Sequence, residues 1–560
     1  MTHAFTFRFE DREIEARPGQ SLAAALLEAG EAGLRETRTG GLRGLYCGMG
    51  VCQECLVRVE KENQPTEQVR ACMTPAQPGL LVTRGRFLAE TDVAGGGAPP
   101  IGLTDLPEEA PEVLVVGGGA GGLAAALAAR QAGCDVLLLD ERKIPGGQYY
   151  KQAGGAPTLD AQQREGEALV AAADRAGVRR WQGAEVWGAF TPDLLLAHHE
   201  GATWRLRPQV LILATGAYER PWPVPGWTLP GVMTTGAAQT LWRSQRTLPG
   251  RRVVVAGAGP LNLQVAWELS RGGAEIVAVA EAAPPPAPSR WRAGARLIAA
   301  GPRLAATGLA QIAALRSAGT RVRWGMQVTR IEASPGGLRA TLDGAGGRET
   351  FEADAVALGY GFLPANEMAR ALGVRHEYDP GRGHLVCVRG PDMQTSVPNV
   401  FAVGDGCGLG GAPAAREEGV IAGLGAAKRL GREGSAAEAG AAARRLVRHR
   451  RFQDALWSVF SAPRVALALA DADTLICRCE EVTRAALDAC MSEGTPDLAE
   501  IKRRTRIGMG RCGGRTCGPL LAEHLAAVAD RPLDEVAGFA PRAPVKPIRI
   551  ADIVGTGAKP

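Results

Sequence analysis

The sequence predicts a multidomain α/β protein, and three observations carry this prediction. The chain has 560 residues, enough for about three or four domains at roughly 150 residues each. Two segments, starting near residues 112 and 251, each read as a buried strand, a glycine-rich turn and a helix, which is typical of a doubly wound parallel sheet. Eight of the 12 cysteines fall into two sets of four, one near each end. Nucleotide-binding-type units are therefore expected between two cysteine-rich domains.

Composition and charge exclude several classes of protein. With 46% hydrophobic residues, 22% charged residues and a net charge of +5, the chain is neither disordered nor equipped with a basic nucleic-acid tail. Glu10, Asp11, Glu13 and Glu15 stand where a signal peptide needs basic and then apolar residues. No run approaches 18 uncharged apolar residues. We therefore expect a cytoplasmic protein with no nucleic-acid partner and no transmembrane segment.

The N-terminal segment predicts a hairpin followed by a helix. Phe5, Phe7 and Phe9 alternate with polar residues as in a half-buried strand, and Ser21 is placed to cap a helix that ends at Gly30. Gly and Pro are frequent from residue 92 to 111, which indicates a linker. The predicted divisions, in chain order, are a cysteine-rich domain, this linker, a first nucleotide-binding part, an inserted second nucleotide-binding domain, the rest of the first, a helical connection, a second cysteine-rich domain and a tail, with bounds 1–91, 92–111, 112–225, 226–345, 346–433, 434–470, 471–530 and 531–560.

Residues 117–122, called loop 1 below, carry the spacing GxGxxG after the strand 113–116. Gly117 permits the tight turn, Gly119 lets a pyrophosphate approach the backbone, and Gly122 lets the helix pack on the strand. The second strand ends at Asp140 and Glu141, which can accept hydrogen bonds from ribose hydroxyls. Together these features predict a dinucleotide site.

Distant segments favour FAD over NAD at this site. Residues 211–221 and 399–408 resemble the closing motifs of flavoproteins with two dinucleotide domains, and the segment 145–148 resembles their turn near the flavin ring. The resemblance implies that Asp405 holds the ribityl chain. It implies further cofactor contacts at Gly147, Gln148, Thr215, Gly216 and Gly404. Because no cysteine follows the 145–148 turn, a dithiol relay at that place is excluded.

Residues 257–262, called loop 2 below, begin the second nucleotide-type unit. Gly257 and Gly259 keep the spacing, but Asn262 replaces the third glycine, so we expect looser helix packing. Glu281 ends the next strand and can bind a ribose. Two interpretations stay open, a second nucleotide such as NAD or ATP, and a nucleotide fold without a ligand.

The first cysteine set has the opening spacing of plant-type [2Fe-2S] ferredoxins, Cys-x4-Cys-x2-Cys. Zinc is the alternative, but zinc ribbons prefer two similar CxxC pairs. Glycines around the loop let the backbone approach cluster sulfides. The set consists of Cys47, Cys52, Cys55 and Cys72.

The second cysteine set also suits [2Fe-2S] better than zinc, because two of its thiols are one residue apart. Its members are Cys477, Cys479, Cys512 and Cys517. Four arginines near them would favour the reduced cluster, namely Arg478, Arg506, Arg511 and Arg515. The remaining cysteines read as small buried hydrophobes, and His198-His199 as part of a solvated loop.

A family resemblance follows from these motifs. YCGMGVCQECLV and RACMTP resemble the small ferredoxin-like subunit of hydrogen cyanide synthase and of opine or hydroxyproline dehydrogenases. CRCEEVT and TRIGMGRCGGRTC resemble the bacterioferritin-associated-ferredoxin-like (BFD-like) end of their large flavoprotein subunit, which is also similar to the alpha subunit of sarcosine oxidase. The resemblance covers nearly the whole chain, with the two subunits fused. It implies a β-grasp ferredoxin domain, a two-dinucleotide-domain FAD flavoprotein and a helical BFD-like [2Fe-2S] domain.

The resemblance also implies a function. The chain would be an FAD-dependent electron-transferring subunit of an amine or amino-acid dehydrogenase, with two [2Fe-2S] clusters and no catalytic residue of its own. A partner flavoprotein of the D-amino-acid oxidase type would oxidise the substrate, with FMN as a further cofactor at the partner interface. The onward acceptor would be a quinone or a ferredoxin-like protein, reached at the inner membrane face.

Two other functions remain open at this point. A self-contained NAD(P)H-dependent reductase would need a working nucleotide site at loop 2. A non-enzymatic iron-handling module would explain the second cysteine set alone and would leave FAD and the first cluster without a purpose.

Overall fold

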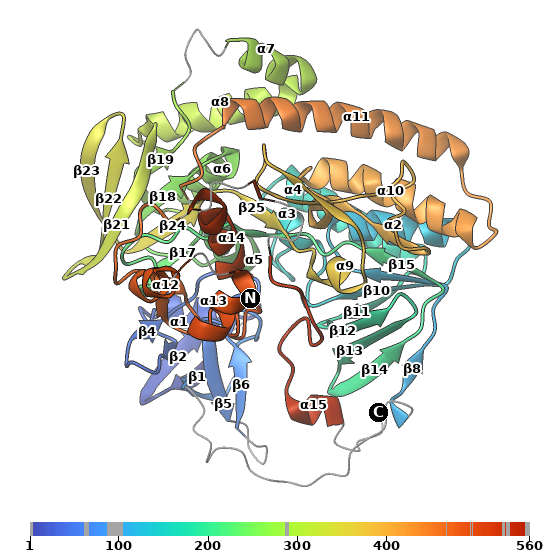
Figure 1. Ribbon diagram of the computed structural model, residues 1–560, viewed down its shortest axis with the longest axis horizontal. Coiled ribbons are helices and arrows are strands. Elements are labelled where there is room, and N and C mark those ends of the chain that lie inside the picture. The colour runs from blue at the N-terminus through green and yellow to red at the C-terminus, as the bar shows by residue number, and fades with distance from the viewer. Residues whose placement is uncertain are drawn as a thin grey trace.

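A computed structural model describes residues 4–60, 66–86, 105–285, 291–465, 467–492, 494, 497–528, 532–533 and 538–554. Figure 1 shows the N-terminal domain in blue beside helices of the C-terminal segment, and two nucleotide-binding-type domains above it. Helix α11 (Ala436–Val459) runs along the opposite edge of the molecule. The predicted order of domains along the chain is recovered.

The N-terminal domain is a five-stranded mixed sheet of strand order β2-β1-β7-β5-β6 with one helix on its face. Its strands β1 and β2 form the expected hairpin, and β1 also runs parallel to β7. The Ser21 hydroxyl accepts the Ala24 amide at 3.2 Å, as predicted for the helix cap. The elements are β1 (Phe5–Phe9), β2 (Arg12–Ala16), α1 (Leu22–Glu28), β3 (Arg35–Glu36), β4 (Leu42–Arg43), β5 (Leu56–Glu60), β6 (Glu67–Arg70) and β7 (Leu81–Arg84).

The first nucleotide-binding domain contains a parallel sheet of order β11-β10-β9-β15-β28. Strand β28 comes from far along the chain, so the domain is built from two pieces as predicted. Helices α2 and α10 pack together on one face, where small alanine and glycine side chains allow close approach. The elements of the sheet layer are β9 (Val113–Val116), α2 (Ala120–Gln131), β10 (Val136–Asp140), α3 (Gly147–Tyr150), α4 (Ala161–Arg175), β11 (Arg179–Gln182), β15 (Val210–Leu213), β28 (Val400–Ala402), η4 (Gly404–Cys407) and α10 (Ala412–Arg429).

An antiparallel sheet covers the other face of this domain, and it corrects two expectations. His198 and His199 lie in strand β13, paired with β14, and not in a loop. Most of the predicted linker falls on residues 87–104, outside the described residues, but β8 pairs with β14, so residues 108–109 already belong to this sheet. The elements are β8 (Glu108–Glu109), β12 (Glu185–Thr191), β13 (Leu194–His199) and β14 (Ala202–Leu206).

The inserted domain has a second parallel sheet, of order β17-β24-β18-β19-β20, and a three-stranded antiparallel sheet. The predicted boundary at residue 345 falls between two paired strands, because β23 pairs with β22, and β24 pairs with β18. We therefore place the end of the insertion after β24. The elements are β17 (Val232–Thr234), α5 (Thr235–Gln245), β18 (Arg252–Gly257), α6 (Pro260–Arg271), β19 (Glu275–Glu281), α7 (Trp291–Ala300), α8 (Pro302–Ser317), β20 (Val322–Trp324), β21 (Met326–Ser334), β22 (Gly337–Gly344), β23 (Gly347–Ala353) and β24 (Ala355–Gly359).

Two antiparallel strands, β16 (Ala217–Glu219) and β25 (Phe362–Pro364), carry the chain between the two nucleotide-type domains. Three short elements follow before β28, namely α9 (Glu367–Ala371), β26 (His376–Asp379) and β27 (His384–Cys387). After α11, a small core gathers the C-terminal domain around residues such as Leu487, Ile501 and Leu521. Its elements are β29 (Leu475–Cys477), β30 (Val482–Thr483), α12 (Arg484–Met491), α13 (Leu498–Thr505) and α14 (Cys517–Val528).

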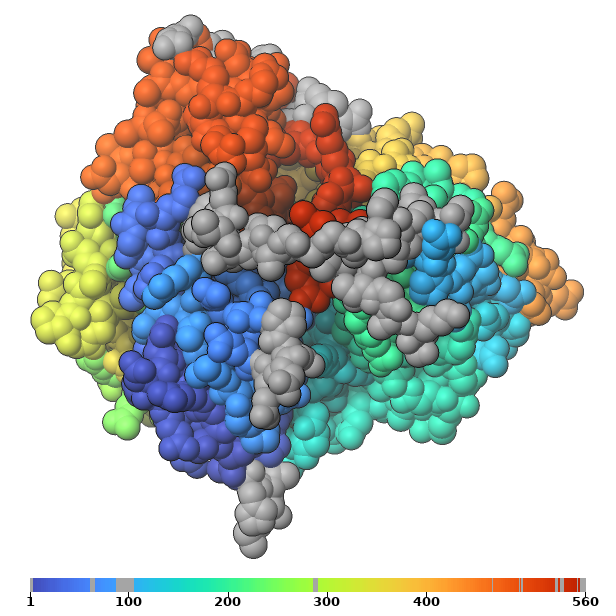
Figure 2. Space-filling view, turned by 90° about the horizontal axis from the view of Figure 1, so that it is seen from below, coloured from blue at the N-terminus to red at the C-terminus, as the bar shows by residue number. Residues whose placement is uncertain are grey.

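The C-terminal tail returns to the first nucleotide-binding domain and ends in α15 (Ile550–Val554). The Val545 amide donates to the Trp187 carbonyl at 2.7 Å. Figure 2 shows blue N-terminal and orange C-terminal residues on one face, with red tail residues between them and the teal domain. In the part of the chain that is described, no single helix is long and apolar enough to cross a membrane; α7 and α8 together meet that test, but the pair is bent by 118°.

Candidate cofactor sites

A cavity of about 250 Å³ runs from loop 1 to the η4 turn. Strands β9, β10, β15 and β28 of the parallel sheet all end along it. It is lined by loop 1, by Asp140 and Glu141, by the turn at Gly147 and Gln148, by Thr215 and Gly216, and by Gly404 and Asp405. The structure thus brings every residue predicted for the first nucleotide into one cavity.

The three glycines of loop 1 have distinct geometric roles. Gly117 has φ +110°, and a Cβ there would lie 2.3 Å from the Ala214 carbonyl oxygen. A Cβ on Gly122 would lie 1.8 Å from the Gly117 oxygen, so only glycine lets α2 pack this close. A Cβ on Gly119 would have no neighbour nearer than 3.9 Å, since this glycine faces the cavity. Helix α2 begins after Gly119 with no side-chain cap, so its first N–H groups are available to an anion.

The two acidic residues that follow β10 have different partners. Asp140 accepts the Gly118 amide at 3.1 Å and the Arg142 amide at 3.0 Å, and burial raises its pKa to about 6. Glu141 pairs with Lys546 of the tail. Burial opposes ionisation of Glu141, but Lys546 and Arg70 outweigh it and lower its pKa. Sequence reasoning missed Lys546, because a tail lysine carries no motif.

At the other end of the cavity, Asp405 is anchored by backbone amides. Its Oδ1 accepts the amides of Gly410 and Gly411 at 2.9 and 2.7 Å, and burial raises its pKa. Gly411 is also the residue before helix α10, so the carboxylate and a helix start share this corner. Thr215 donates its hydroxyl to the Ala365 carbonyl and holds the β16–β25 connection against the cavity.

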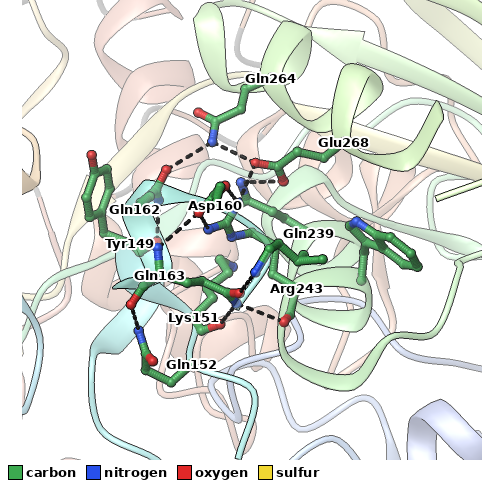
Figure 3. Close-up of polar contacts among 12 residues, drawn as sticks. Tyr149, Lys151, Gln152, Asp160, Gln162, Gln163, Gln239, Arg243, Gln264 and Glu268 are labelled. Carbon is green, nitrogen blue, oxygen red and sulfur yellow. Dashed lines mark hydrogen bonds and ion pairs between the residues drawn. The ribbon is translucent and has the colours of Figure 1, made fainter. Parts of the chain in front are cut away.

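A buried polar network behind the Gly147–Gln148 turn joins the two nucleotide-type domains (Figure 3). Lys151 donates to the Gln148 side-chain oxygen at 3.0 Å and to the Thr240 hydroxyl at 2.7 Å, and burial lowers its pKa to about 7. Arg243 is fully buried and pairs with Asp160 at 2.7 Å and with Glu268 of α6 at 2.8 Å. The network fixes both the Gln148 side chain and the angle between the domains, and no local sequence pattern indicates it.

The first cysteine set forms two contacts between neighbouring thiols. The Cys52 amide donates to the Cys47 sulfur at 3.4 Å, and the Cys72 amide donates to the Cys55 sulfur at 3.5 Å. Hydrogen bonding from the Cys52 thiol is the main reason that the pKa of Cys47 falls to about 6. The set therefore offers one thiol pair for each of two iron ions.

The second cysteine set is connected as a chain of thiols. Hydrogen bonds from Cys479 and Cys517 lower the pKa of Cys477 to about 3, and a hydrogen bond from Cys479 lowers that of Cys512 to about 7. Within the described residues, no three His, Cys, Asp or Glu side chains converge on a single metal position. That arrangement does not suit one zinc ion, whereas paired thiols fit a two-iron cluster.

Loop 2 has the same course as loop 1 but different hydrogen bonds. Glu281 accepts the Gly259 amide at 3.0 Å, and burial raises its pKa to about 7. The Ala258 amide donates to Gly359 at 2.9 Å, and Pro260, the first residue of α6, has no amide proton. The expected loose packing is not found, because Asn262 is 2% exposed and donates to the Gly359 carbonyl at 2.9 Å.

The arginines near the second cysteine set are not equivalent. Arg506 is 62% exposed and pairs with Glu480, and Arg511 bonds the Gln68 side chain of the N-terminal domain. Arg515 and Arg478 are buried. The expectation that all four act on the cluster is thus narrowed to two. The single cysteines Cys134, Cys387, Cys407 and Cys490 are all buried, as predicted.

Comparison with known proteins agrees with this geometry. The model of the family "Pyridine nucleotide-disulphide oxidoreductase" matches residues 111–419, more than half of the chain. The chain belongs to this family. A 2Fe-2S iron-sulfur cluster binding domain matches residues 2–86, and a BFD-like [2Fe-2S] binding domain matches residues 475–527. This family member is therefore an FAD-dependent oxidoreductase with two [2Fe-2S] clusters.

Several curated relatives resemble the chain over most of its length. The larger-scale match to an opine oxidase component of Agrobacterium tumefaciens is 31% identical over 79% of this chain and 91% of the relative. The HcnB component of hydrogen cyanide synthase from Pseudomonas aeruginosa is 31% identical over 80% and 99%. The alpha component of sarcosine oxidase from Corynebacterium sp. is 28% identical over 64% of this chain and 37% of its own. The resemblance expected from the motifs is confirmed.

One solved structure shares the whole architecture. A chain described as L-proline dehydrogenase from P. horikoshii has a TM-score of 0.72 and 19% identity, over 99% of this chain and 98% of its own. At this identity the likeness concerns the fold alone. It includes the cysteine-rich domains at both ends.

Proposed function

We propose that the chain is the electron-transferring subunit of a multi-subunit dehydrogenase or oxidase of an amine or amino acid, of the opine, sarcosine, hydroxyproline or glycine type. The proposal is supported by relatives that are themselves named as subunits of opine oxidase, hydrogen cyanide synthase and sarcosine oxidase. The observation that carries it is the meeting of three sites. Met49 and Val51 of the first cysteine loop and Arg515 of the second line the same cavity as Gly119 and Asp405.

The residues have the following proposed roles. Loop 1 holds the FAD pyrophosphate, Asp140 the ribose, and Asp405 the ribityl chain, while Glu141 and Lys546 close the cavity over the tail. Each cysteine set holds one [2Fe-2S] cluster. When bound, FAD exchanges electron pairs and the clusters take single electrons. The protein itself keeps the Gln148 turn fixed through Lys151 and excludes water with Met49 and Val51.

The substrate pocket is proposed to lie in a partner flavoprotein of the D-amino-acid oxidase type, with FMN at the interface. A screen of amino acids and opines under anaerobic conditions tests this division. The chain alone should keep its flavin colour with every substrate, and the co-purified partner complex should lose it with one class. Amine turnover by the isolated chain would contradict the proposal.

We propose further that electrons leave at the inner face of a membrane, to a quinone or a ferredoxin-like acceptor. Helices α7 and α8 support this location. They stand out at the edge of the molecule (Figure 1), and Trp291 and Leu309 are each 65% exposed. No Asp or Glu occurs from residue 282 to 331, a stretch that carries eight arginines. Exposed apolar side chains among arginines suit a surface of anionic lipid.

Vesicle sedimentation tests this surface. The holoprotein should bind phosphatidylglycerol vesicles and not phosphatidylcholine vesicles, and Trp291→Ser with Leu309→Ser should abolish binding. Phe190→Ser is the matched control, since Phe190 is 47% exposed on β12 of the other nucleotide domain. Equal binding by the double variant would contradict the location.

A further inference from the structure

Each cysteine loop carries one charged residue between two of its thiols, and the two charges have opposite sign. Glu54 stands between Cys52 and Cys55, and Arg478 between Cys477 and Cys479. They are 424 residues apart in the chain, yet the Arg478 guanidinium lies 3.2 Å from the Glu54 carboxylate. Their side chains are 2% and 1% exposed. The two cluster loops are therefore joined directly by a buried ion pair.

Arg478 is held on every side. Its Nη1 donates to the Trp227 carbonyl at 2.9 Å, and its guanidinium lies 4.0 Å from the centre of the Tyr46 ring and 4.7 Å from that of the Trp227 ring. The Trp227 indole in turn donates to the Leu475 carbonyl at 2.8 Å, two residues before Cys477. Stacking on aromatic rings is a contact that arginine makes and most other cations make less well.

Glu54 has further partners on its own domain. Arg35 lies 3.0 Å and Arg43 3.7 Å from its carboxylate, and Arg43 also faces Glu481 of the C-terminal domain at 3.6 Å. Taking such charges out of water costs energy that their attraction only partly returns, so a buried pair is poor evidence for stability. Buried pairs are better explained by the position they specify.

Charge close to an iron-sulfur cluster changes its reduction potential. The positive charge of Arg478 favours an electron on the cluster of the second set. The negative charge of Glu54 disfavours one on the cluster of the first set, and Arg35 and Arg43 reduce that effect.

We infer that Glu54 and Arg478 are a positioning pair that fixes the two cluster loops against each other and makes the C-terminal cluster the easier one to reduce. A single electron then leaves the reduced N-terminal cluster and enters the oxidised C-terminal one. No bond forms or breaks in this step, and no proton is needed. The inference rests on the proposed function for the source of the electrons.

A redox titration of the full chain with dithionite, followed by electron paramagnetic resonance, tests the pair without partner or amine. Cys52→Ser and Cys512→Ser assign each signal to its cluster. Arg478→Gln should lower the midpoint of the C-terminal cluster, and Glu54→Gln should raise that of the N-terminal cluster. Arg506→Gln, the exposed control in the same domain, should shift neither. A merely structural role would not produce opposite shifts on different clusters.

Shifts in the same direction, or none in variants that keep their iron and sulfide, would overturn the inference. If a Gln variant loses a cluster, Arg478→Lys replaces it, since it keeps the charge but not the fork or the stacking. That variant should keep both midpoints and slow electron exchange between the clusters, and an unchanged rate would also overturn the inference. Failure of the amine screen leaves these potentials untouched, so the two proposals fail separately.

Discussion

Loops 1 and 2 are two copies of one motif with different capacity for a phosphate. Each follows the central strand of a parallel sheet and starts a helix of 12 residues. In loop 1 the positions that face the ligand are Gly119, Ala120 and Gly121, and helix α2 starts there without a cap. The corresponding positions in loop 2 are Gly259, whose amide is bonded to Glu281, Pro260, which has none, and Leu261. Loop 2 thus offers one of three donors.

The packing of loop 2 shows how the third glycine was replaced without loss of the fold. Asn262 takes its place, and the missing space is found on the strands. A Cβ on Gly359 would lie 2.2 Å from the Asn262 oxygen, and a Cβ on Gly257 would lie 2.5 Å from its nitrogen. The Thr235 hydroxyl donates to the Asn262 oxygen at 2.8 Å. The second domain keeps its architecture while its turn bonds to itself, which argues against the NAD(P)H-dependent reductase.

The largest effect is expected at loop 1. In Gly122→Ala the new Cβ meets the Gly117 oxygen at 1.8 Å and must push the loop open. Overpacking of this kind costs about 1–3 kcal/mol, or about 5- to 150-fold weaker FAD binding. Flavin content and fluorescence titration of the apoprotein measure it. Gly440→Ala in helix α11, where a Cβ has only the Arg444 side chain near it, is the matched control and should keep its flavin.

A pH effect is expected at loop 2. Burial raises the pKa of Glu281 to about 7, whereas an unfolded glutamate titrates near 4.3. The folded protein therefore binds the extra proton between these values, and its stability falls as pH rises through them, by up to about 3 kcal/mol. Glu281→Gln should remove this slope between pH 5 and 7 in denaturant unfolding. Glu275→Gln, exposed on the same strand, should retain it.

The smallest effect is expected from restoring the missing glycine. Asn262→Gly recreates the GxGxxG spacing but leaves the buried Gly359 carbonyl and the Thr235 hydroxyl without a partner. The free energy of unfolding should fall by about 1–3 kcal/mol. Ser270→Gly on the same helix changes helix propensity alone and should cost about 0.5 kcal/mol. A gain of NADH binding by Asn262→Gly would show that the side chain, and not the bonded backbone, closes the loop.

The parts predicted best from sequence are those fixed by local geometry. Gly117 and Gly122 sit where a Cβ is forbidden, Ser21 caps its helix, and the cysteine spacings fall on single loops. Parts that depend on distant partners were missed. Nothing near Glu54 in sequence indicates Arg478, 424 residues away.

Two errors share one cause. The boundary at residue 345 is wrong because the strands β22, β23 and β24 alternate alike, and only the pairing of β24 with β18 assigns them to the inserted domain. The looser packing expected at Asn262 is wrong because its compensating glycine, Gly359, lies 97 residues away.

The central claim is that electrons reach the FAD from a partner and not from a nicotinamide nucleotide at loop 2. Anaerobic mixing of the purified holoprotein with excess NADH or NADPH tests it most directly, with visible absorbance as the readout and dithionite as the positive control. Neither nucleotide should change the flavin or cluster absorbance, while dithionite should bleach both. Bleaching of the flavin by NADH or NADPH in the absence of any partner would contradict the claim.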